Sequence, residues 1–484
     1  MSSPTASAPP DSRAPGGNYR WVICSLLFFS VAVNYIDRLV IGILKKPLSA
    51  ELGWSDADYG HIAAAFSFAY AFGYLIGGPL MDRWGVKKGL PIFVTAWSIA
   101  ASAHGLVGLI GVEEVFRFSY PAWIDGGLRM ATLVMPMTAA GFMFARIALG
   151  LTEGGNFPGA IKAVAEWYPV RERALATGLF NAGTNVGAVV CPIAVPVMYR
   201  TMGWESTFYV TGATGFIWVV AWWLIYDRPE KHRRVSAAEL AYINEGVPPE
   251  PEKESQGSAF SLRAIGAFFV AWFRVLGYRA VWAYVLASIL AGPAWGFYQF
   301  FLPDFLDKTF HLDLQQIGNW TGAFFLIAAV GGVLGGWLAN KLMNRGWSVN
   351  GARKISLLIC AIAVVPVFLA PFAPNVWLAV LIVGIAGSAH QGWSANLFSV
   401  VSDTMPKSAV STVVGLGGFV AYFTGGFVNE FTGQILQKTG SYVYVFAYFS
   451  GMYLLSLLLI QFLVPVIGRT AAARVAPKES APGR

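Results

Sequence analysis

The stretch GGPLMDRWGVKKG, residues 77–89, indicates how this chain folds. It follows a long apolar run and joins small residues, which let helices approach closely in a membrane, to a short basic turn. A similar stretch, GGWLANKLMNRGWSVNGARK at residues 335–354, follows another apolar run in the second half of the chain. Short inner loops tend to be basic in any membrane protein. A match at corresponding positions of both halves nevertheless favours an internal repeat.

The composition extends this membrane signal to the whole chain. Of its 484 residues, 56% are hydrophobic and 12% are charged, whereas a globular domain carries about 25% charged residues. Apolar runs of about 20 residues, each long enough to cross the hydrocarbon core, recur along the sequence. We count twelve, centred near residues 31, 70, 99, 142, 186, 217, 292, 328, 362, 389, 422 and 454. The sequence therefore predicts an all-α integral membrane protein without a soluble enzyme domain.

Polar segments divide the twelve runs into two groups of six. The longest, which includes NEGVPPEPEKESQGS at residues 244–258, predicts a cytoplasmic linker. The Pro- and Ser-rich start predicts a disordered tail and lacks the order of a signal peptide. Two parallel six-helix repeats are the architecture of a major facilitator transporter. The predicted parts are a tail (1–19), an N-terminal six-helix bundle (20–227), the linker (228–279), a C-terminal six-helix bundle (280–467) and a second cytoplasmic tail (468–484).

The distribution of the residues that give the net charge of +8 indicates how the chain is oriented in the membrane. Most Lys and Arg fall in segments that lie on the inner side if both termini are inside, and the opposite orientation would invert this bias. The positive-inside rule therefore places both termini in the cytoplasm, and we expect no nucleic-acid partner. The three cysteines, Cys24, Cys191 and Cys360, lie inside apolar runs without metal or disulfide spacing, so no metal site is predicted.

Two apolar runs contain charges that need an explanation. Asp37 and Arg38 lie in VAVNYIDRLVIG, residues 31–42, and ARIALGLTEGG, residues 145–155, contains Arg146 and Glu153. A charge near the bilayer centre costs roughly 3 kcal/mol on insertion scales. Neighbours on a helix point about 100° apart, so Asp37 and Arg38 need partners on another helix. A purely architectural salt-bridge cluster is one interpretation.

A functional interpretation gives the acids and the arginines different tasks. A guanidinium stays charged and its planar fork matches a carboxylate, so Arg38 and Arg146 are predicted to bind an organic anion. A buried carboxyl group can alternate between a protonated state and an arginine-paired state as its surroundings change. Asp37 and Glu153 are therefore predicted to couple protons to the anion, and this coupling must be reciprocal.

Several of these stretches resemble a known family. GGPLMDRWGVKKG resembles the loop signature of the major facilitator superfamily, carried here by Gly78, Asp82, Arg83, Gly85 and Lys87. NYIDR at 34–38, the segment 145–188 and AHQGWSANLFSVVSDTMPK at 389–407 resemble, more narrowly, the anion:cation symporter family and especially its hexuronate transporters. The resemblance covers about residues 20–467 and implies that the acids matching Asp37 and Glu153 couple protons. The outer segment 107–130 departs from it, being longer than the family's usual connection.

Neutral polar residues inside the apolar runs suit a polyhydroxylated ring, although ordinary interhelical hydrogen bonds are the alternative for each. The resemblance implies substrate contacts at Tyr70, Gln299, Trp393 and Asn396. His390 could titrate near neutral pH, but we favour a neutral hydrogen-bonding role at the binding site.

The predicted function is secondary active transport. We expect proton-coupled uptake of an organic anion, a hexuronate such as glucuronate or galacturonate, by a monomer in the lipid of a bacterial inner membrane. Protons are the coupling ion and no other cofactor is expected. Another carboxylate (an aldonate, an aldarate or an aromatic acid) is an alternative substrate, and a membrane channel is an alternative class. The sequence has no HExxH, clustered histidines or CxxC, so we predict no catalytic residues and no enzyme.

Overall fold

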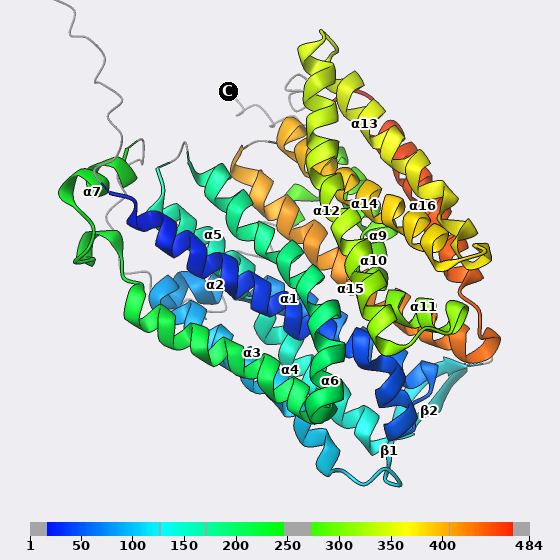
Figure 1. Cartoon of the computed structure of the whole chain (residues 1–484). Helices are drawn as coiled ribbons and strands as arrows, with labels where there is room; N and C mark the ends of the chain where they lie inside the picture. The colour runs from blue at the N-terminus through cyan, green and yellow to red at the C-terminus, as the bar shows by residue number, and fades with distance from the viewer. Residues whose placement is uncertain (1–16, 125–126, 170–171, 246–272, 406, 468–484) are drawn as a thin grey trace, which may run out of the picture.

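The computed structural model describes residues 17–124, 127–169, 172–245, 273–405 and 407–467. Its helices form two bundles that lie side by side (Figure 1). The N-terminal bundle consists of α1 (Tyr19–Leu52), α2 (Asp56–Trp84), α3 (Val86–Leu106), α4 (Met137–Glu153), α5 (Asn156–Trp167) and α6 (Arg173–Ile225). The C-terminal bundle consists of α9 (Arg279–Ala291), α10 (Pro293–Phe300), α11 (Leu302–Phe310), α12 (Leu314–Asn344), α13 (Val349–Val364), η3 (Val365–Phe372), α14 (Val376–Thr404), α15 (Lys407–Thr439) and α16 (Val443–Leu463).

These helices account for twelve membrane crossings. Within the described residues, ten segments are long and apolar enough to span, and one of them, α6, contains two helices joined at Gly203, whose φ is 80°. The fourth crossing is made by α4 and α5, which are short separately but follow each other across Gly154 and Gly155 in helical conformation. In lipid only such helices satisfy every backbone polar group within the segment.

The long outer connection forms a β-hairpin. After a short helix, η1 (Val107–Leu109), β1 (Val115–Ile124) pairs antiparallel with β2 (Gly127–Pro136). The register places Val115 opposite Pro136. The fourth crossing therefore begins at Met137, directly after β2.

The segment between the bundles contains two short elements, η2 (Pro229–Lys231) and α7 (Ala237–Ile243). The buried carboxylate of Glu239 on α7 pairs with Arg20 at 3.4 Å, which holds α7 against the start of α1. Residues 246–272 of the predicted linker and most of the predicted tails lie outside the described residues. We call the end of the molecule that holds α7 the inner end, and the opposite end the outer end (Figure 1).

The two bundles contact each other near the outer end and separate toward the inner end. A Cβ atom added at Gly433 of α15 would lie 2.7 Å from Cα of Gly60 on α2, and one at Gly318 of α12 would meet the carbonyl of Pro192 on α6. On the inner halves of the same four helices, four glycines have no atom within 4 Å of an added Cβ. Those glycines are Gly78, Gly178, Gly336 and Gly415. Figure 1 shows the same divergence toward α7, so the structure is open to the inner end.

An ionic cluster joins the bundles at the outer end. Lys45 Nζ of α1 lies 2.7 Å from both Asp56 Oδ1 and Asp304 Oδ2, and Lys308 Nζ lies 2.5 Å from Asp56 Oδ2 and 3.5 Å from Asp304 Oδ2. Tyr442 also donates a hydrogen bond to Asp304. Lys45 and Asp304 are buried, so separating the bundles here would leave charges without partners. We call these four charged residues the outer ionic cluster.

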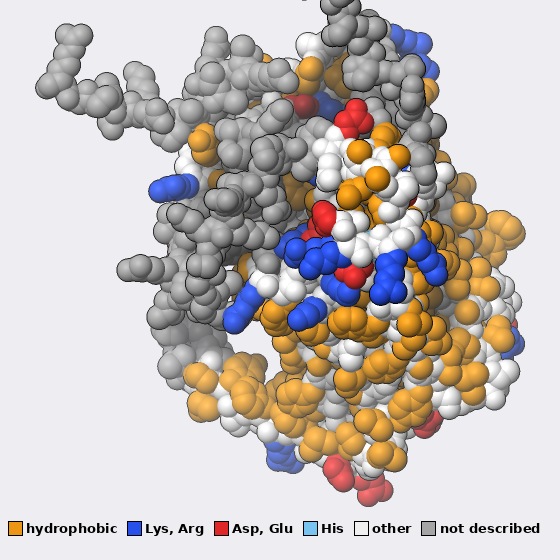
Figure 2. Space-filling model, turned by 90° about the vertical axis from the view of Figure 1, so that its left-hand side faces the viewer, with side chains coloured by type: hydrophobic (Ala, Val, Ile, Leu, Met, Phe, Trp, Pro, Cys, Tyr) orange, Lys and Arg blue, Asp and Glu red, His pale blue; other side chains and the backbone are white. Residues whose placement is uncertain are grey.

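Basic side chains border the apolar surface toward the inner end. Figure 2 shows Lys and Arg gathered just above a broad hydrophobic band on the N-terminal bundle. Arg83 and Lys88, at the junction of α2 and α3, and Arg228 and Lys231, after the end of α6, are exposed. This border marks where the helices leave the apolar band.

Candidate functional site

Four charged side chains lie together inside the N-terminal bundle. Asp37 and Arg38 are on α1, and Arg146 and Glu153 are on α4. Each of the four is at most 2% exposed. The fold therefore brings all the predicted intramembrane charges into one cluster, built from two helices.

Arg38 and Glu153 form the central ion pair of this cluster. Nε and Nη2 of Arg38 both donate to Oε2 of Glu153, at 3.0 and 2.9 Å. The other oxygen of Glu153, Oε1, has no hydrogen-bond partner among the described residues. Two donors on one oxygen make a charge-assisted pair, and the second oxygen remains free for a proton or a donor.

The other sides of Arg38 meet aromatic and amide groups. Its Nη2 donates to Asn34 Oδ1 at 3.3 Å, and its Nη1 donates to the Tyr422 hydroxyl of α15 at 3.4 Å. The guanidinium carbon lies 4.4 Å from the ring centre of Tyr70 and 5.1 Å from that of Tyr35. Because Glu153 holds Nε and Nη2, Nη1 is the edge of the fork that a ligand can reach.

Arg146 and Asp37 are less completely paired. Nη1 of Arg146 donates to the backbone carbonyl of Arg38 at 3.1 Å, but its Nε and Nη2 have no partner among the described residues. Both carboxylate oxygens of Asp37 also lack a hydrogen-bond partner among the described residues, although Arg146 and Thr211 lie near them. The cluster thus contains one closed ion pair and one buried acid with an incompletely paired arginine beside it.

A cavity of about 240 Å³ reaches this cluster. Its walls include Arg38, Tyr70, Tyr74 and Asn181 from the N-terminal bundle and Tyr422 from the C-terminal bundle. We call it the N-side cavity. The remaining three charges of the cluster, Asp37, Arg146 and Glu153, lie behind its wall.

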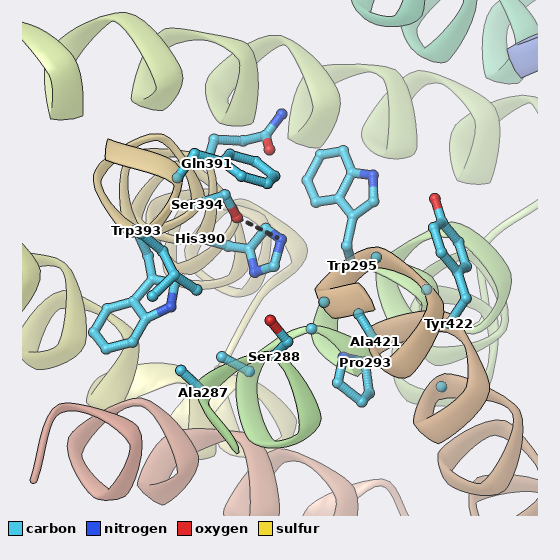
Figure 3. A pocket seen from close by; sticks show the side chains of 18 of the residues that line it. Ala287, Ser288, Pro293, Trp295, His390, Gln391, Trp393, Ser394, Ala421 and Tyr422 are labelled. Carbon is cyan, nitrogen blue, oxygen red and sulfur yellow. Dashed lines mark hydrogen bonds between the residues drawn. The ribbon is translucent and has the colours of Figure 1, made fainter. Parts of the chain in front are cut away.

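A second cavity of about 270 Å³ lies mainly in the C-terminal bundle (Figure 3). Trp295, His390 and Trp393 are among its lining residues, with Ser288 and Gln391. We call it the C-side cavity. It shares wall residues Phe398, Gly418 and Tyr422 with the N-side cavity, so the two cavities adjoin.

His390 is held firmly within the C-side cavity. Its Nδ1 lies 2.6 Å from the Tyr453 hydroxyl, and its Nε2 lies 3.5 Å from the hydroxyl of Ser394, an interaction drawn in Figure 3. The imidazole stacks on Trp295 with ring centres 5.4 Å apart. No Asp or Glu occurs among the described residues that line either cavity. This environment fits a neutral imidazole, with one nitrogen donating and the other accepting.

Two predicted substrate contacts lie behind the cavity walls. Gln299 is buried and its amide donates to the Tyr35 hydroxyl at 3.1 Å, across the bundles. The amide of Asn396 donates to the carbonyls of Gly335 at 3.0 Å and Gly392 at 2.9 Å, joining α14 to α12. The structure does not bring either side chain to the surface of the two cavities.

The sequence did not single out three residues that surround Arg38. Asn34 and Tyr35 lie one turn before Arg38 on α1, and that spacing could have identified them. Tyr422 comes from α15, and nothing local in its sequence points to Arg38. Its hydroxyl accepts from Arg38, and its ring lies 4.4 Å from that of Tyr70.

The loop-signature residues lie at the inner end of α2 and the start of α3. Gly85 ends α2 with φ 71°. Lys87 Nζ lies 2.8 Å from Asp227 Oδ2 beyond α6, and the hydrogen bond from this ammonium holds the pKa of Asp227 below its ordinary value. Arg83 is exposed, and the side chain of Asp82 lies outside the described residues. The Lys87–Asp227 pair fixes the loop to the end of α6.

Among the described residues, no group of three or more His, Cys, Asp or Glu side chains could hold a metal ion.

Comparison with known sequences connects this geometry to a family. The model of the Major Facilitator Superfamily matches residues 27–429. A hexuronate transporter of Escherichia coli (strain K12) is 28% identical over 423 residues, which are 87% of this chain and 88% of that protein. A probable galactarate/D-glucarate transporter of Bacillus subtilis (strain 168) is 27% identical over 438 residues, 89% of each chain.

Solved structures share the same fold. A D-xylose-proton symporter superposes with a TM-score of 0.67 at 15% identity, covering 94% of this chain and 99% of that one. An inward-facing, occupied bacterial homologue of the human lysosomal transporter Spinster superposes with a TM-score of 0.61 at 19% identity, covering 95% and 96% of the two chains. The predicted all-α fold with twelve membrane crossings is confirmed.

Proposed function

This chain belongs to the Major Facilitator Superfamily, and we propose that it is a secondary transporter that takes up a sugar acid together with protons. It is a multi-pass membrane transporter and not an enzyme. The proposed substrate is a hexuronate such as glucuronate or galacturonate. The sugar-acid relatives support this choice, since they match most of the chain.

The observation that carries the proposal is the position of Arg38 at the junction of a charged cluster and a cavity. One edge of its guanidinium faces the N-side cavity while the other edge is held by Glu153. A substrate carboxylate at the free edge competes with Glu153 for the single positive charge of the same guanidinium. The binding of an anion and the charge of Glu153 are therefore linked.

Proton coupling follows from this competition. In the structure Arg38 and Glu153 neutralise each other, which suits an empty carrier that must return across the membrane without a net buried charge. When Glu153 takes a proton, the fork of Arg38 is released for the substrate carboxylate, and the loaded site is again neutral. Asp37, buried and unpaired beside Arg146, is proposed as the second proton-carrying group.

The two cavities divide the substrate between them. We assign the carboxylate to Arg38 and Tyr70 in the N-side cavity, and the hydroxyl-bearing body to Trp393 and His390 in the C-side cavity. Gln299, Asn396 and Arg146, which lie behind the walls, are proposed to position the residues that touch substrate.

We also propose a conformational state, an orientation in the membrane and an oligomeric state for this transporter. The closed outer ionic cluster and the open inner end support an inward-open state, reached after substrate release. The basic border at the inner end supports cytoplasmic termini in a bacterial inner membrane. We propose a monomer surrounded by lipid, with protons as the coupling ion and no other cofactor.

Uptake into proteoliposomes tests the function. The protein should accumulate labelled D-glucuronate against its gradient when an inward proton gradient is imposed, and it should not do so when a protonophore is present. Uptake that only equilibrates the label, with or without the gradient, would indicate a channel. Accumulation of a different carboxylate alone would keep the transporter and replace the substrate.

A further inference from the structure

The distribution of cations around the two cavities bears on which sugar acids can bind. Among the described residues that line either cavity, Arg38 is the sole Lys or Arg. Arg353, a cation of the C-terminal bundle, lies outside both walls and pairs with Asp403 at 3.0 Å. A second anionic group in the site would therefore have no cationic partner.

The C-side cavity offers neutral polar groups instead. The indole Nε1 of Trp393 is buried without a hydrogen-bond partner among the described residues. In Figure 3 the hydroxyl of Ser288 is directed toward the interior, near His390, and Gln391 lies on the wall beyond it. An indole N–H, a hydroxyl and an amide match sugar hydroxyls, which both donate and accept hydrogen bonds.

His390 does not supply the missing positive charge. Its two ring nitrogens face the hydroxyls of Tyr453 and Ser394, and its face stacks on Trp295. No carboxylate lines the cavity in the described part of the chain to hold a proton on this ring. The imidazole is therefore another neutral hydrogen-bonding group.

A sugar acid with two terminal carboxylates has one carboxylate too many for the single cation, Arg38, in either orientation. In the substrate arrangement proposed above, whichever end binds Arg38, the other carboxylate lies in the C-side cavity, which adjoins the N-side cavity at Tyr422. Moving a charge out of water without a partner is far more costly than moving a hydroxyl that finds one.

We propose that the transporter selects sugar acids with one carboxylate and rejects aldarates, because the C-side cavity holds no cation. This inference rests on the proposed function and adds a rule that separates hexuronates and aldonates from dicarboxylates. The position that determines the rule is Gln391, which lines the cavity, is partly exposed and lies where a cation could stand.

A matched pair of ligands tests the rule directly. D-gluconate and D-glucarate have the same open chain and differ in one terminal group, a hydroxymethyl in the first and a carboxylate in the second. Binding to the purified full chain is measured by calorimetry at pH 7, where all the carboxylates are ionised. D-glucuronate is included as the cyclic acid with one carboxylate. We expect D-gluconate and D-glucuronate each to bind at least tenfold more tightly than D-glucarate.

A gain-of-function variant tests the cause. Gln391→Arg places a guanidinium in the C-side cavity and should raise the affinity for D-glucarate at least tenfold. Gln391→Met, similar in size and uncharged, should not. If the open-chain acids do not bind the parent protein, the affinity of the two variants for D-glucarate tests the selection rule.

The possible results distinguish a failure of the selection rule from a failure of the proposed function. Equal or tighter binding of D-glucarate by the parent protein overturns the selection rule and leaves the sugar-acid transporter intact. A D-glucarate affinity that Gln391→Arg does not change also overturns it. If none of the three acids binds, the proposed function itself fails and the rule with it.

Discussion

The two bundles have related architectures but differ in the charges they bury. In the N-terminal bundle, α1 and α4 enclose two acids and two arginines at the level of the cavities. In the described part of the C-terminal bundle, the buried Asp, Glu, His, Lys and Arg side chains are Asp304, which belongs to the outer ionic cluster, and His390. The repeat of a scaffold therefore does not imply a repeat of its chemistry. Buried charge is costly, and one cluster of it suffices to couple an anion to a proton.

The sharpest test of this division is Arg38→Lys. The charge is kept, but an ammonium cannot reproduce the planar fork. We expect D-glucuronate affinity, measured by calorimetry, to fall about 30-fold, equivalent to ~2 kcal/mol for a charge-assisted hydrogen bond lost with its geometry. Arg345→Lys, on an exposed loop, is the matched control and should bind like the parent. Normal affinity in Arg38→Lys would mean that the N-terminal bundle does not hold the carboxylate.

The next test removes a titratable proton from the N-terminal bundle. Glu153→Gln imitates the protonated acid and leaves the fork of Arg38 free, so the anion should still bind. Proton-driven accumulation should disappear, a loss of about tenfold per pH unit of gradient for one coupled proton. Exchange of labelled for unlabelled substrate in the same vesicles needs only the loaded carrier and should persist.

Asp37→Asn should behave in the same way if Asp37 is the second proton carrier. Accumulation that survives both substitutions would place the coupling acids elsewhere. Glu430, 2.6 Å from His61 across the seam between α2 and α15, would then be the first candidate. Loss of binding in both variants would favour an architectural role for the charge cluster.

A smaller effect is expected from the aromatic wall of the C-terminal bundle. Trp393→Ala removes contact area and an indole N–H but no charge, so affinity should fall about fivefold, or ~1 kcal/mol, with proton-driven accumulation retained. Trp377→Ala, on the same helix but 72% exposed, is the control and should not change affinity. If the two variants bind alike, Trp393 has only a packing role.

The smallest effect is expected at His390. His390→Gln keeps a group that can hydrogen-bond to the Tyr453 hydroxyl, so affinity should stay within about threefold of the parent and accumulation should be unchanged. Calorimetry measures the affinity, and uptake with and without a proton gradient measures the accumulation. A loss of accumulation would show that the C-terminal bundle carries a proton as well, and the division between the bundles would not hold.

The sequence by itself determined the fold class and the charged cluster. A membrane admits a continuous backbone only as helices or closed barrels, so apolar runs of sufficient length identify the crossings. The cost of buried charge likewise singled out Asp37, Arg38, Arg146 and Glu153 without any contact being known. The long outer segment was visible as an extra length, but its hairpin was not predicted.

Only the tertiary structure decided how these side chains are paired. Helical spacing fixes the angle of a residue around its own axis, whereas its depth against another helix depends on packing. α4 can approach α2 this closely because Gly154, at its end, has no side chain. An added Cβ there would lie 2.3 Å from the backbone of Gly73 on α2. In this arrangement Glu153 pairs with Arg38, while Arg146 donates to the backbone carbonyl of Arg38. In the same way, contacts between distant helices bring Tyr422 to Arg38 and join Asn396 to the backbone of α12, because no local pattern encodes which faces of two remote helices will meet.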